Sequence, residues 1–221
     1  MSEIIRISSD SVSGFLHKPE HAADDGLVLT HGAGSNCQAP LLIAVADAFA
    51  SAGLAVLRCD LPFRQRRRFG PPSPASASAD RSGLKDAVFE MRHTVSRRVF
   101  LGGHSYGGRQ ASILASDDPE ICDGLVLLSY PLHPPNKPEQ LRTAHFSAIR
   151  IPCLFVHGTS DPFGTIQELT TALEEIPSKT ELIVIENAGH DLAKGRFDVP
   201  NVLVKPFWTL MLGRQPALFG A

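Results

Sequence analysis

Short apolar runs alternate along this chain with segments whose apolar positions recur every three or four residues. Runs of the first kind, bounded by Gly, Pro, Asn or Asp, are typical of buried strands, and the second spacing is typical of helices packed on one face. Strands are predicted at residues 4–7, 12–17, 27–29, 54–59, 99–101, 124–130, 151–158 and 181–185. Helices are predicted at residues 40–51, 80–94, 109–116, 139–147 and 165–176, and a further one contains Trp208.

The order of these elements predicts the fold class. The first two strands form a hairpin, and from residue 27 onward strands and helices alternate without an internal repeat. This order is typical of an α/β protein with a doubly wound, mostly parallel sheet and helices on both faces. Residues 71–79, rich in Pro, Ser and Ala, are the most loop-like stretch. We expect a single domain over residues 1–221 with a minimal cap or none.

A Gly-x-Ser-x-Gly turn with Gly103, Ser105 and Gly107 joins the predicted strand 99–101 to the predicted helix 109–116. In so sharp a turn, a Cβ atom at the position two residues before or after the serine would collide with the neighbouring strand or helix. This explains why both positions are glycine. The turn would hold the Ser105 hydroxyl at the carboxyl end of the strand, beside the first N–H groups of a helix. The alternative is a glycine-rich turn that carries an ordinary serine.

Asp161 and His190 supply the two other groups that activate a serine. A serine becomes a nucleophile near neutral pH when an imidazole takes its proton and a carboxylate orients that imidazole. Ser105, Asp161 and His190 each follow a predicted parallel strand, so we expect all three at one edge of the sheet, as a catalytic triad. His31 and His157 precede glycines at strand ends and are expected to bind turn backbone instead.

A second glycine-containing loop, residues 31–36, follows the predicted strand 27–29. Acyl-transfer enzymes of this architecture take one oxyanion donor from such a loop, so the N–H of Ala33 or of a flanking glycine, with the N–H of Tyr106, is the expected oxyanion hole. A tight turn or a phosphate cradle is the alternative. A dinucleotide fingerprint needs a third glycine where this chain has Cys37, which weakens the phosphate interpretation.

Arg66, Arg67 and Arg68 belong to an arginine cluster at residues 64–68. Their loop leaves the same sheet edge as Ser105, which puts a carboxylate or phosphate of the substrate within reach of paired guanidiniums. The alternative is a solvated loop, because runs of charge commonly only face solvent.

Four short motifs carry a resemblance to a known family: His31-Gly32-Ala33-Gly34, Gly103-His104-Ser105-Tyr106-Gly107-Gly108, His157-Gly158-Thr159-Ser160-Asp161 and Ala188-Gly189-His190. With these four motifs in this order, the chain resembles the α/β-hydrolase superfamily over nearly its whole length. It resembles in particular small capless members akin to dienelactone hydrolase and short-chain carboxylesterases. The resemblance implies the α/β-hydrolase fold and hydrolysis by a triad. Dienelactone hydrolase itself has a cysteine nucleophile where this chain has Ser105. Residues 63–74 also resemble a branch of hydrolase-like proteins that includes scaffold components.

Composition narrows the partners and the compartment. A formal charge of −2, from 21 Lys and Arg against 23 Asp and Glu, gives no support for nucleic acid or an anionic membrane as the main partner. The first ten residues lack a signal pattern and no apolar stretch approaches a membrane span, so we expect a cytoplasmic protein. The four scattered cysteines are expected to be buried thiols, with Cys37 nearest a site loop. No metal or other cofactor is expected, because no His, Asp and Glu cluster has ligand spacing.

These observations predict a serine hydrolase that cleaves an ester or thioester of a small-molecule substrate through an acyl-enzyme. One alternative is a hydrolase fold used only as an interaction or scaffold module. Another is a lyase or perhydrolase with the same residues. The tail at residues 215–221 is a candidate contact for a homodimer, with an ordinary terminal contact as the alternative.

Overall fold

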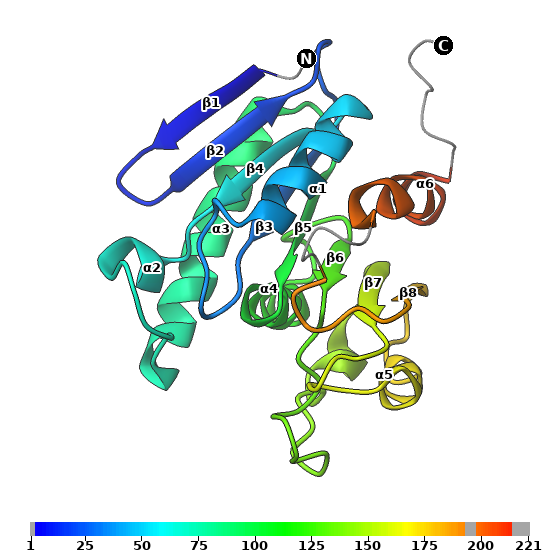
Figure 1. Ribbon diagram of the computed structural model, residues 1–221. Helices are drawn as coiled ribbons and strands as arrows, with labels where there is room; N and C mark the ends of the chain where they lie inside the picture. The colour runs from blue at the N-terminus through cyan, green and yellow to red at the C-terminus, as the bar shows by residue number, and fades with distance from the viewer. Residues whose placement is uncertain (1–2, 193–197, 214–221) are drawn as a thin grey trace.

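The computed structural model describes residues 3–192 and 198–213 of the 221-residue chain. One eight-stranded sheet runs through it in the order β1-β2-β4-β3-β5-β6-β7-β8 (Figure 1). The first two pairs in this order are antiparallel and all the others are parallel. The strands are β1 (Glu3–Ser8), β2 (Ser13–Lys18), β3 (Gly26–Thr30), β4 (Ala55–Cys59), β5 (Val99–His104), β6 (Leu125–Leu128), β7 (Cys153–Gly158) and β8 (Thr180–Ile185).

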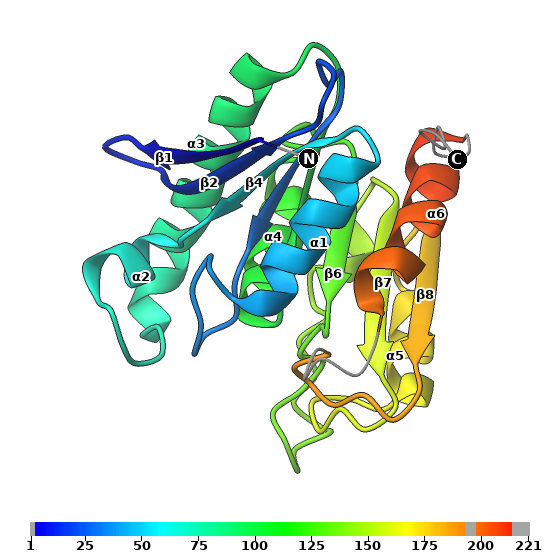
Figure 2. The ribbon, with the colours of Figure 1, turned by 45° about the horizontal axis from the view of Figure 1, so that its top comes forward.

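Helices cover both faces of the sheet, which confirms the predicted doubly wound α/β class. Figure 2 shows α1 (Pro40–Ser51) and α6 (Val199–Leu212) on the same side of the sheet. Their apolar residues form one core cluster with Leu27 and Leu29 of β3, whereas Val28, between them, belongs to the second cluster. That second cluster is completed by α3 (Ala77–Thr94), α4 (Tyr106–Asp117) and α5 (Ile166–Leu173). Successive residues of a strand point to opposite faces, so the sheet separates two apolar cores.

The burial of each strand follows its place in the sheet. Every residue of β3, β4, β6 and β7 is buried, because helices cover both faces of these inner strands. Such strands are continuous apolar runs in the sequence, which is why they could be located from the sequence alone. The edge strands β1 and β8 have mostly exposed or half-buried residues.

The predicted helix at residues 139–147 is wrong. This segment is irregular apart from the short 3-10 helix η2 (Phe146–Ala148). At Arg142 its backbone bonds to a neighbouring turn: Arg142 N–H donates to Leu132 O over 2.8 Å, and the Tyr130 hydroxyl donates to Arg142 O over 2.7 Å. Tertiary hydrogen bonds thus replace the helical ones that the polar composition allowed.

The stretch expected to be a loop is partly helical. Residues 71–79 contain the 3-10 helix η1 (Pro74–Ser76) and the first turn of α3, which begins at Ala77 instead of residue 80, and the arginine cluster before them begins within α2 (Pro62–Arg66). Asp80, in the first turn of α3, is buried, and its carboxylate accepts hydrogen bonds from Phe63 N–H over 2.9 Å and from the Tyr106 hydroxyl over 2.8 Å. These bonds tie α2, α3 and α4 together beside Ser105.

Two further expectations concern the ends and surroundings of the chain. The tail at residues 215–221, the candidate dimer contact, lies outside the described residues. Within the described ranges, no helix combines the length and the apolar character that crossing a membrane requires.

Candidate active site

Ser105 lies in a sharp turn between β5 and α4, as the glycine pattern predicts. Its backbone has φ 51° and ψ −116°, a conformation that residues other than glycine rarely adopt. The surrounding backbone is packed too tightly for larger residues. A Cβ on Gly103 would lie 2.7 Å from Thr30 O, and one on Gly107 would lie 2.6 Å from Thr30 Cγ2. The glycines therefore allow β3 and the start of α4 to approach the turn that presents Ser105.

The structure brings Ser105, His190 and Asp161 together at the carboxyl edge of the parallel strands. The His190 Nε2 and Ser105 Oγ atoms are 2.7 Å apart, and His190 Nδ1 lies 2.8 Å from Asp161 Oδ2 and 3.0 Å from Oδ1. With the Nδ1 proton donated to the carboxylate, Nε2 is the acceptor for the Ser105 hydroxyl. This is the geometry in which an imidazole can take the proton of a serine.

Asp161 is held as an anion. Burial alone would raise the pKa of this carboxyl, but the hydrogen bond and charge of His190 lower the pKa below its usual value, helped by Phe163 N–H and by His157. The Phe163 N–H donates to Asp161 Oδ1 over 2.9 Å. His157 is itself buried, which lowers its pKa, and its Nε2 donates to Gly164 O over 2.8 Å. His157 thus supports the turn that carries Asp161, as expected of a histidine that precedes a glycine.

His104 and Phe163 position His190, a role that the sequence did not indicate. The Phe163 ring stacks on the His190 imidazole with centroids 4.1 Å apart and planes 29° apart. His104 Nε2 donates to the His190 carbonyl oxygen over 2.7 Å. Burial lowers the pKa of His104 to about 4, so this imidazole is neutral at physiological pH. One ring therefore fixes the imidazole plane of His190 and another fixes its backbone.

The loop after β3 lies directly against Ser105. A Cβ on Gly32 would be 3.4 Å from Ser105 Cβ and 3.0 Å from His104 Nδ1. Ala33 lines the same pocket as Ser105 and Tyr106. Within the described residues, neither the Ala33 N–H nor the Tyr106 N–H donates to a protein acceptor. Both donors are therefore available at the position where the oxyanion hole was expected.

Arg64, in α2, holds this loop from behind. It is 7% exposed, and its guanidinium donates to Ala33 O over 2.9 Å and to Ser35 O over 2.7 Å. The same guanidinium also donates to three carbonyl oxygens of the following loop: Arg67 O at 3.2 Å, Arg68 O at 2.8 Å and Gly70 O at 3.0 Å. One buried cation thus joins the two loops that border the serine. The sequence analysis placed this residue in the arginine cluster, but the sequence does not indicate where its side chain points.

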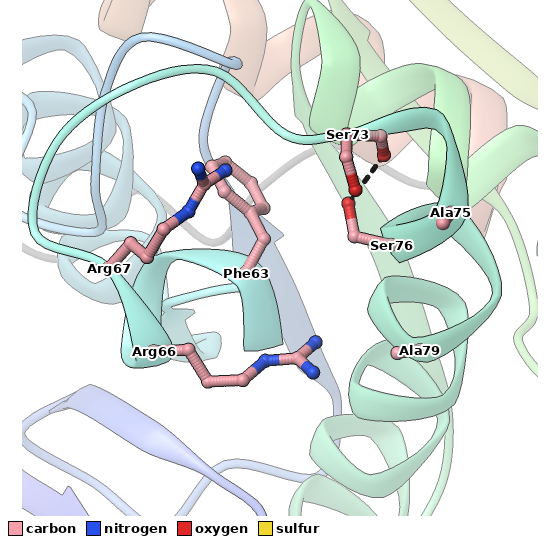
Figure 3. A pocket seen from close by; sticks show the side chains of 7 residues that line it. All are labelled: Phe63, Arg66, Arg67, Ser73, Ala75, Ser76 and Ala79. Atoms are coloured by element: carbon pink, nitrogen blue, oxygen red, sulfur yellow. Dashed lines mark hydrogen bonds between the residues drawn. The ribbon is translucent and has the colours of Figure 1, made fainter.

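Arg66, Arg67 and Arg68 do not line the pocket that contains Ser105. Arg66 and Arg67 line a separate pocket of about 430 Å³ between α2 and the start of α3, shown in Figure 3 with the Ser76 hydroxyl bonded to Ser73 O. Each also binds a nearby carbonyl: Arg66 Nε donates to Pro62 O over 3.1 Å, and Arg67 Nη2 to Pro71 O over 2.7 Å. Arg68 lies over the ring of exposed Phe69, 5.3 Å from its centroid.

The pocket at Ser105 has a volume of about 510 Å³. Two arginines that the sequence analysis did not single out, Arg109 and Arg142, line it with Phe163, four prolines and the polar side chain of Gln110. Arg109 follows Ser105 by one helical turn, and Arg142 comes from the segment that was wrongly predicted to be helical. The pocket thus combines the candidate nucleophile with two guanidiniums.

The cysteines are buried, and the possible metal ligands of the described residues do not gather into a cluster. All four cysteines are buried and free, and burial raises the pKa of the Cys37 thiol to about 12, so it is protonated at neutral pH. Among the described residues, no group of three or more His, Cys, Asp or Glu side chains is arranged to hold a metal ion.

A family model described as "Alpha/beta hydrolase domain" matches residues 23–198, a span that includes the serine, the aspartate and the histidine of the site. The chain belongs to the alpha/beta hydrolase family. The resemblance to this family is thereby confirmed, and membership supports a hydrolase activity.

Solved structures of the same fold include hydrolases from several bacteria. A dienelactone hydrolase from Anabaena variabilis is 23% identical, with a TM-score of 0.75 over 96% of this chain and 98% of that one. The protein Est1E from Butyrivibrio proteoclasticus, solved with ferulic acid bound, is 15% identical, with a TM-score of 0.75 over 95% and 100%. A serine hydrolase without a lid from Xanthomonas campestris is 16% identical, with a TM-score of 0.72 over 93% of each chain. At these identities the likeness concerns the fold.

Proposed function

We propose that this protein is a serine hydrolase that cleaves a carboxylic ester or thioester of a small molecule through an acyl-enzyme. The observation that carries the proposal is the continuous line of contacts from Ser105 Oγ to His190 Nε2, at 2.7 Å, and from His190 Nδ1 to Asp161 Oδ2, at 2.8 Å. A scaffold has no need for a strained serine aligned with an imidazole and a buried carboxylate.

In the acylation step, Ser105 Oγ attacks the carbonyl carbon of the ester while its proton passes to His190 Nε2. Asp161 stabilises the imidazolium that forms, and the N–H groups of Ala33 and Tyr106 donate to the developing oxyanion. When the tetrahedral intermediate collapses, the bond to the leaving alcohol or thiol breaks. His190 returns the proton to that leaving group, and the acyl group stays on Ser105.

Water completes the turnover. His190 takes a proton from a water molecule that attacks the acyl carbon, the same two N–H groups bind the second oxyanion, and His190 returns the proton to Ser105 Oγ as the acid leaves. His104 and Phe163 serve this step by keeping the imidazole in one orientation, since His190 must face the substrate twice in each turnover.

The test is the hydrolysis of 4-nitrophenyl acetate and butyrate by the wild-type protein and by Ser105→Ala. The variant is expected to lose roughly 10⁴- to 10⁶-fold in kcat, as triad deletions do in other hydrolases. Ser116→Ala is a matched control, because Ser116 lies in the same helix and its hydroxyl donates to the backbone oxygen of Ile113. Equal activity of wild type and Ser105→Ala would contradict the proposal.

A further inference from the structure

Two positively charged side chains meet in the pocket of Ser105. Arg109 is placed by α4, whose first turn closes with Arg109 N–H donating to Ser105 O over 3.0 Å. Arg142 reaches the same pocket from the segment between β6 and β7, where its Nη1 donates to Pro131 O over 3.3 Å. Partial burial lowers the pKa of Arg142, and the nearby charge of Arg109 lowers it further. The two guanidiniums are therefore close enough to repel each other.

No carboxylate balances this pair. None of the described residues that line the pocket is acidic, and in the described structure neither arginine forms an ion pair. The Arg109 Nε atom is buried and has no hydrogen-bond partner. Two partly desolvated cations without a counter-ion destabilise a fold, so their place beside the serine calls for a functional reason.

The neighbours of Arg109 are uncharged or already bound. The Tyr130 hydroxyl lies beside both guanidiniums and donates to Arg142 O. His145 has its pKa lowered to about 4 by burial and by the charge of Arg109, so it is neutral. Asp80 approaches the region, but its two oxygens accept from Phe63 N–H and the Tyr106 hydroxyl. The protein thus leaves donor capacity for a negatively charged ligand.

We propose that Arg109 and Arg142 form an anion subsite, and that the substrate is an ester or thioester whose acid or alcohol part carries a carboxylate or phosphate. This inference rests on the proposed hydrolase function. Four helical residues rise about 6 Å from Ser105 to Arg109, so the anionic group lies only a few bonds from the scissile carbonyl. Pro71, Pro72 and Phe163 form the apolar wall along which the linking carbon atoms lie. Paired guanidiniums suit such oxyanions because each presents several donors in one plane.

The kinetic test compares three acetate esters that share one reacting group. In 4-acetoxybenzoate the leaving group carries a carboxylate, in 4-acetoxyphenyl phosphate it carries a phosphate, and in methyl 4-acetoxybenzoate it is neutral. A mono-4-nitrophenyl adipate and its methyl ester repeat the comparison with the charge on the acyl side. Wild type is expected to prefer at least one anionic ester by about tenfold to a hundredfold in kcat/KM over its neutral partner, the range of a charge-assisted hydrogen bond. The preferred member identifies carboxylate or phosphate.

Arg109→Gln and Arg142→Gln are each expected to reduce this preference at least tenfold, because kcat/KM should fall more for the anionic ester than for its neutral partner. Arg150→Gln is the matched control, because Arg150 is exposed and its Nη1 donates to Ser147 O. The proposal is overturned if wild type has no preference, if both variants keep it, or if Arg66→Gln and Arg67→Gln abolish it while Arg109→Gln and Arg142→Gln do not.

A binding measurement separates this inference from the hydrolase proposal. Calorimetry with Ser105→Ala compares 4-acetoxybenzoate and 4-acetoxyphenyl phosphate with the neutral methyl ester. Tighter binding of an anion, lost in Ser105→Ala/Arg109→Gln, supports the subsite even if no ester is hydrolysed. Equal affinities overturn it even if neutral esters are hydrolysed. Thermal unfolding supplies a readout that a structural role would not give: removal of an unbalanced cation should leave the midpoint unchanged or raise it, whereas loss of a structural arginine should lower it.

Discussion

Replacement of Arg64 by Met should slow catalysis from a position that cannot touch the substrate. The guanidinium of this arginine donates to five backbone carbonyl oxygens over 2.7–3.2 Å, two of them, in Ala33 and Ser35, on the proposed oxyanion loop. Methionine keeps most of the side-chain volume but removes every donor. The carbonyl groups would then lose their partners, and the loop would no longer be held at a fixed distance from Ser105.

The expected magnitudes follow from these contacts. A hydrogen bond from a charged donor contributes about 1.5–3 kcal/mol, but five bonds from one group are not additive, so Arg64→Met should lower the free energy of unfolding by roughly 3–4 kcal/mol. Loss of a whole oxyanion donor costs about 10²–10³ in kcat. A donor that is displaced but present should cost roughly tenfold to a hundredfold. KM should change little, because the N–H groups act mainly on the charge of the transition state.

The assay is steady-state hydrolysis of 4-nitrophenyl acetate, well below the unfolding midpoint of each variant. Arg64→Lys keeps the charge but not the planar guanidinium, so its kcat should lie between those of Arg64→Met and the wild-type protein. Arg92→Met is the matched control, since Arg92 also donates to two backbone carbonyls, Glu120 O and Ile121 O, but in a loop between α4 and β6. A folded Arg64→Met protein with kcat within twofold of wild type would refute the positioning role.

Three further predictions concern the surroundings of the serine. His104→Phe keeps a ring beside His190 but removes the donor to its carbonyl oxygen, so kcat should fall by about tenfold, measured with the same ester. Gly107→Ala places a Cβ 2.6 Å from Thr30 Cγ2, and urea unfolding should reveal a loss of about 2 kcal/mol or more; a stable variant would contradict the tight packing. Burial lowers the pKa of His104 and His145 from 6.5 to about 4, so the unfolded chain binds more protons below pH 6.5. The free energy of unfolding should therefore decrease from about pH 6.5 toward pH 4, and the lowered pKa of Asp161 extends the loss to more acidic pH. A titration of urea midpoints that is flat over this range would contradict the burial of these imidazoles.

The parts of the fold that could be predicted are those in which a local pattern has a local cause. The inner strands are continuous apolar runs because both faces of the sheet are covered, and Gly103 and Gly107 mark a turn that only glycine allows. Parallel strands bring their carboxyl ends to one edge, which is why Ser105, Asp161 and His190 could be selected although they are far apart in the chain.

The remaining features depend on tertiary contacts that the sequence does not display. Residues 139–147 have a composition compatible with a helix, yet their backbone bonds to the turn that contains Leu132. The arginine cluster at residues 64–68 indicated charge near the site but not its direction: Arg64 points inward to five carbonyls, while Arg66 and Arg67 line another pocket. A long flexible side chain covers several directions from one backbone position, so its packing partners decide where its charge lies.

The most direct test of the central claim is the reaction of the protein with a fluorophosphonate probe, read by intact mass. The reagent reports an activated serine without any knowledge of the substrate. The account predicts a single adduct on the wild-type protein, none on Ser105→Ala, and strongly slowed labelling of His190→Ala, because the probe reacts with a serine whose proton an imidazole can take, and His190 Nε2 lies 2.7 Å from Ser105 Oγ. No adduct on folded wild-type protein, or an adduct that persists in Ser105→Ala, would contradict the claim that Ser105, His190 and Asp161 act as a catalytic unit.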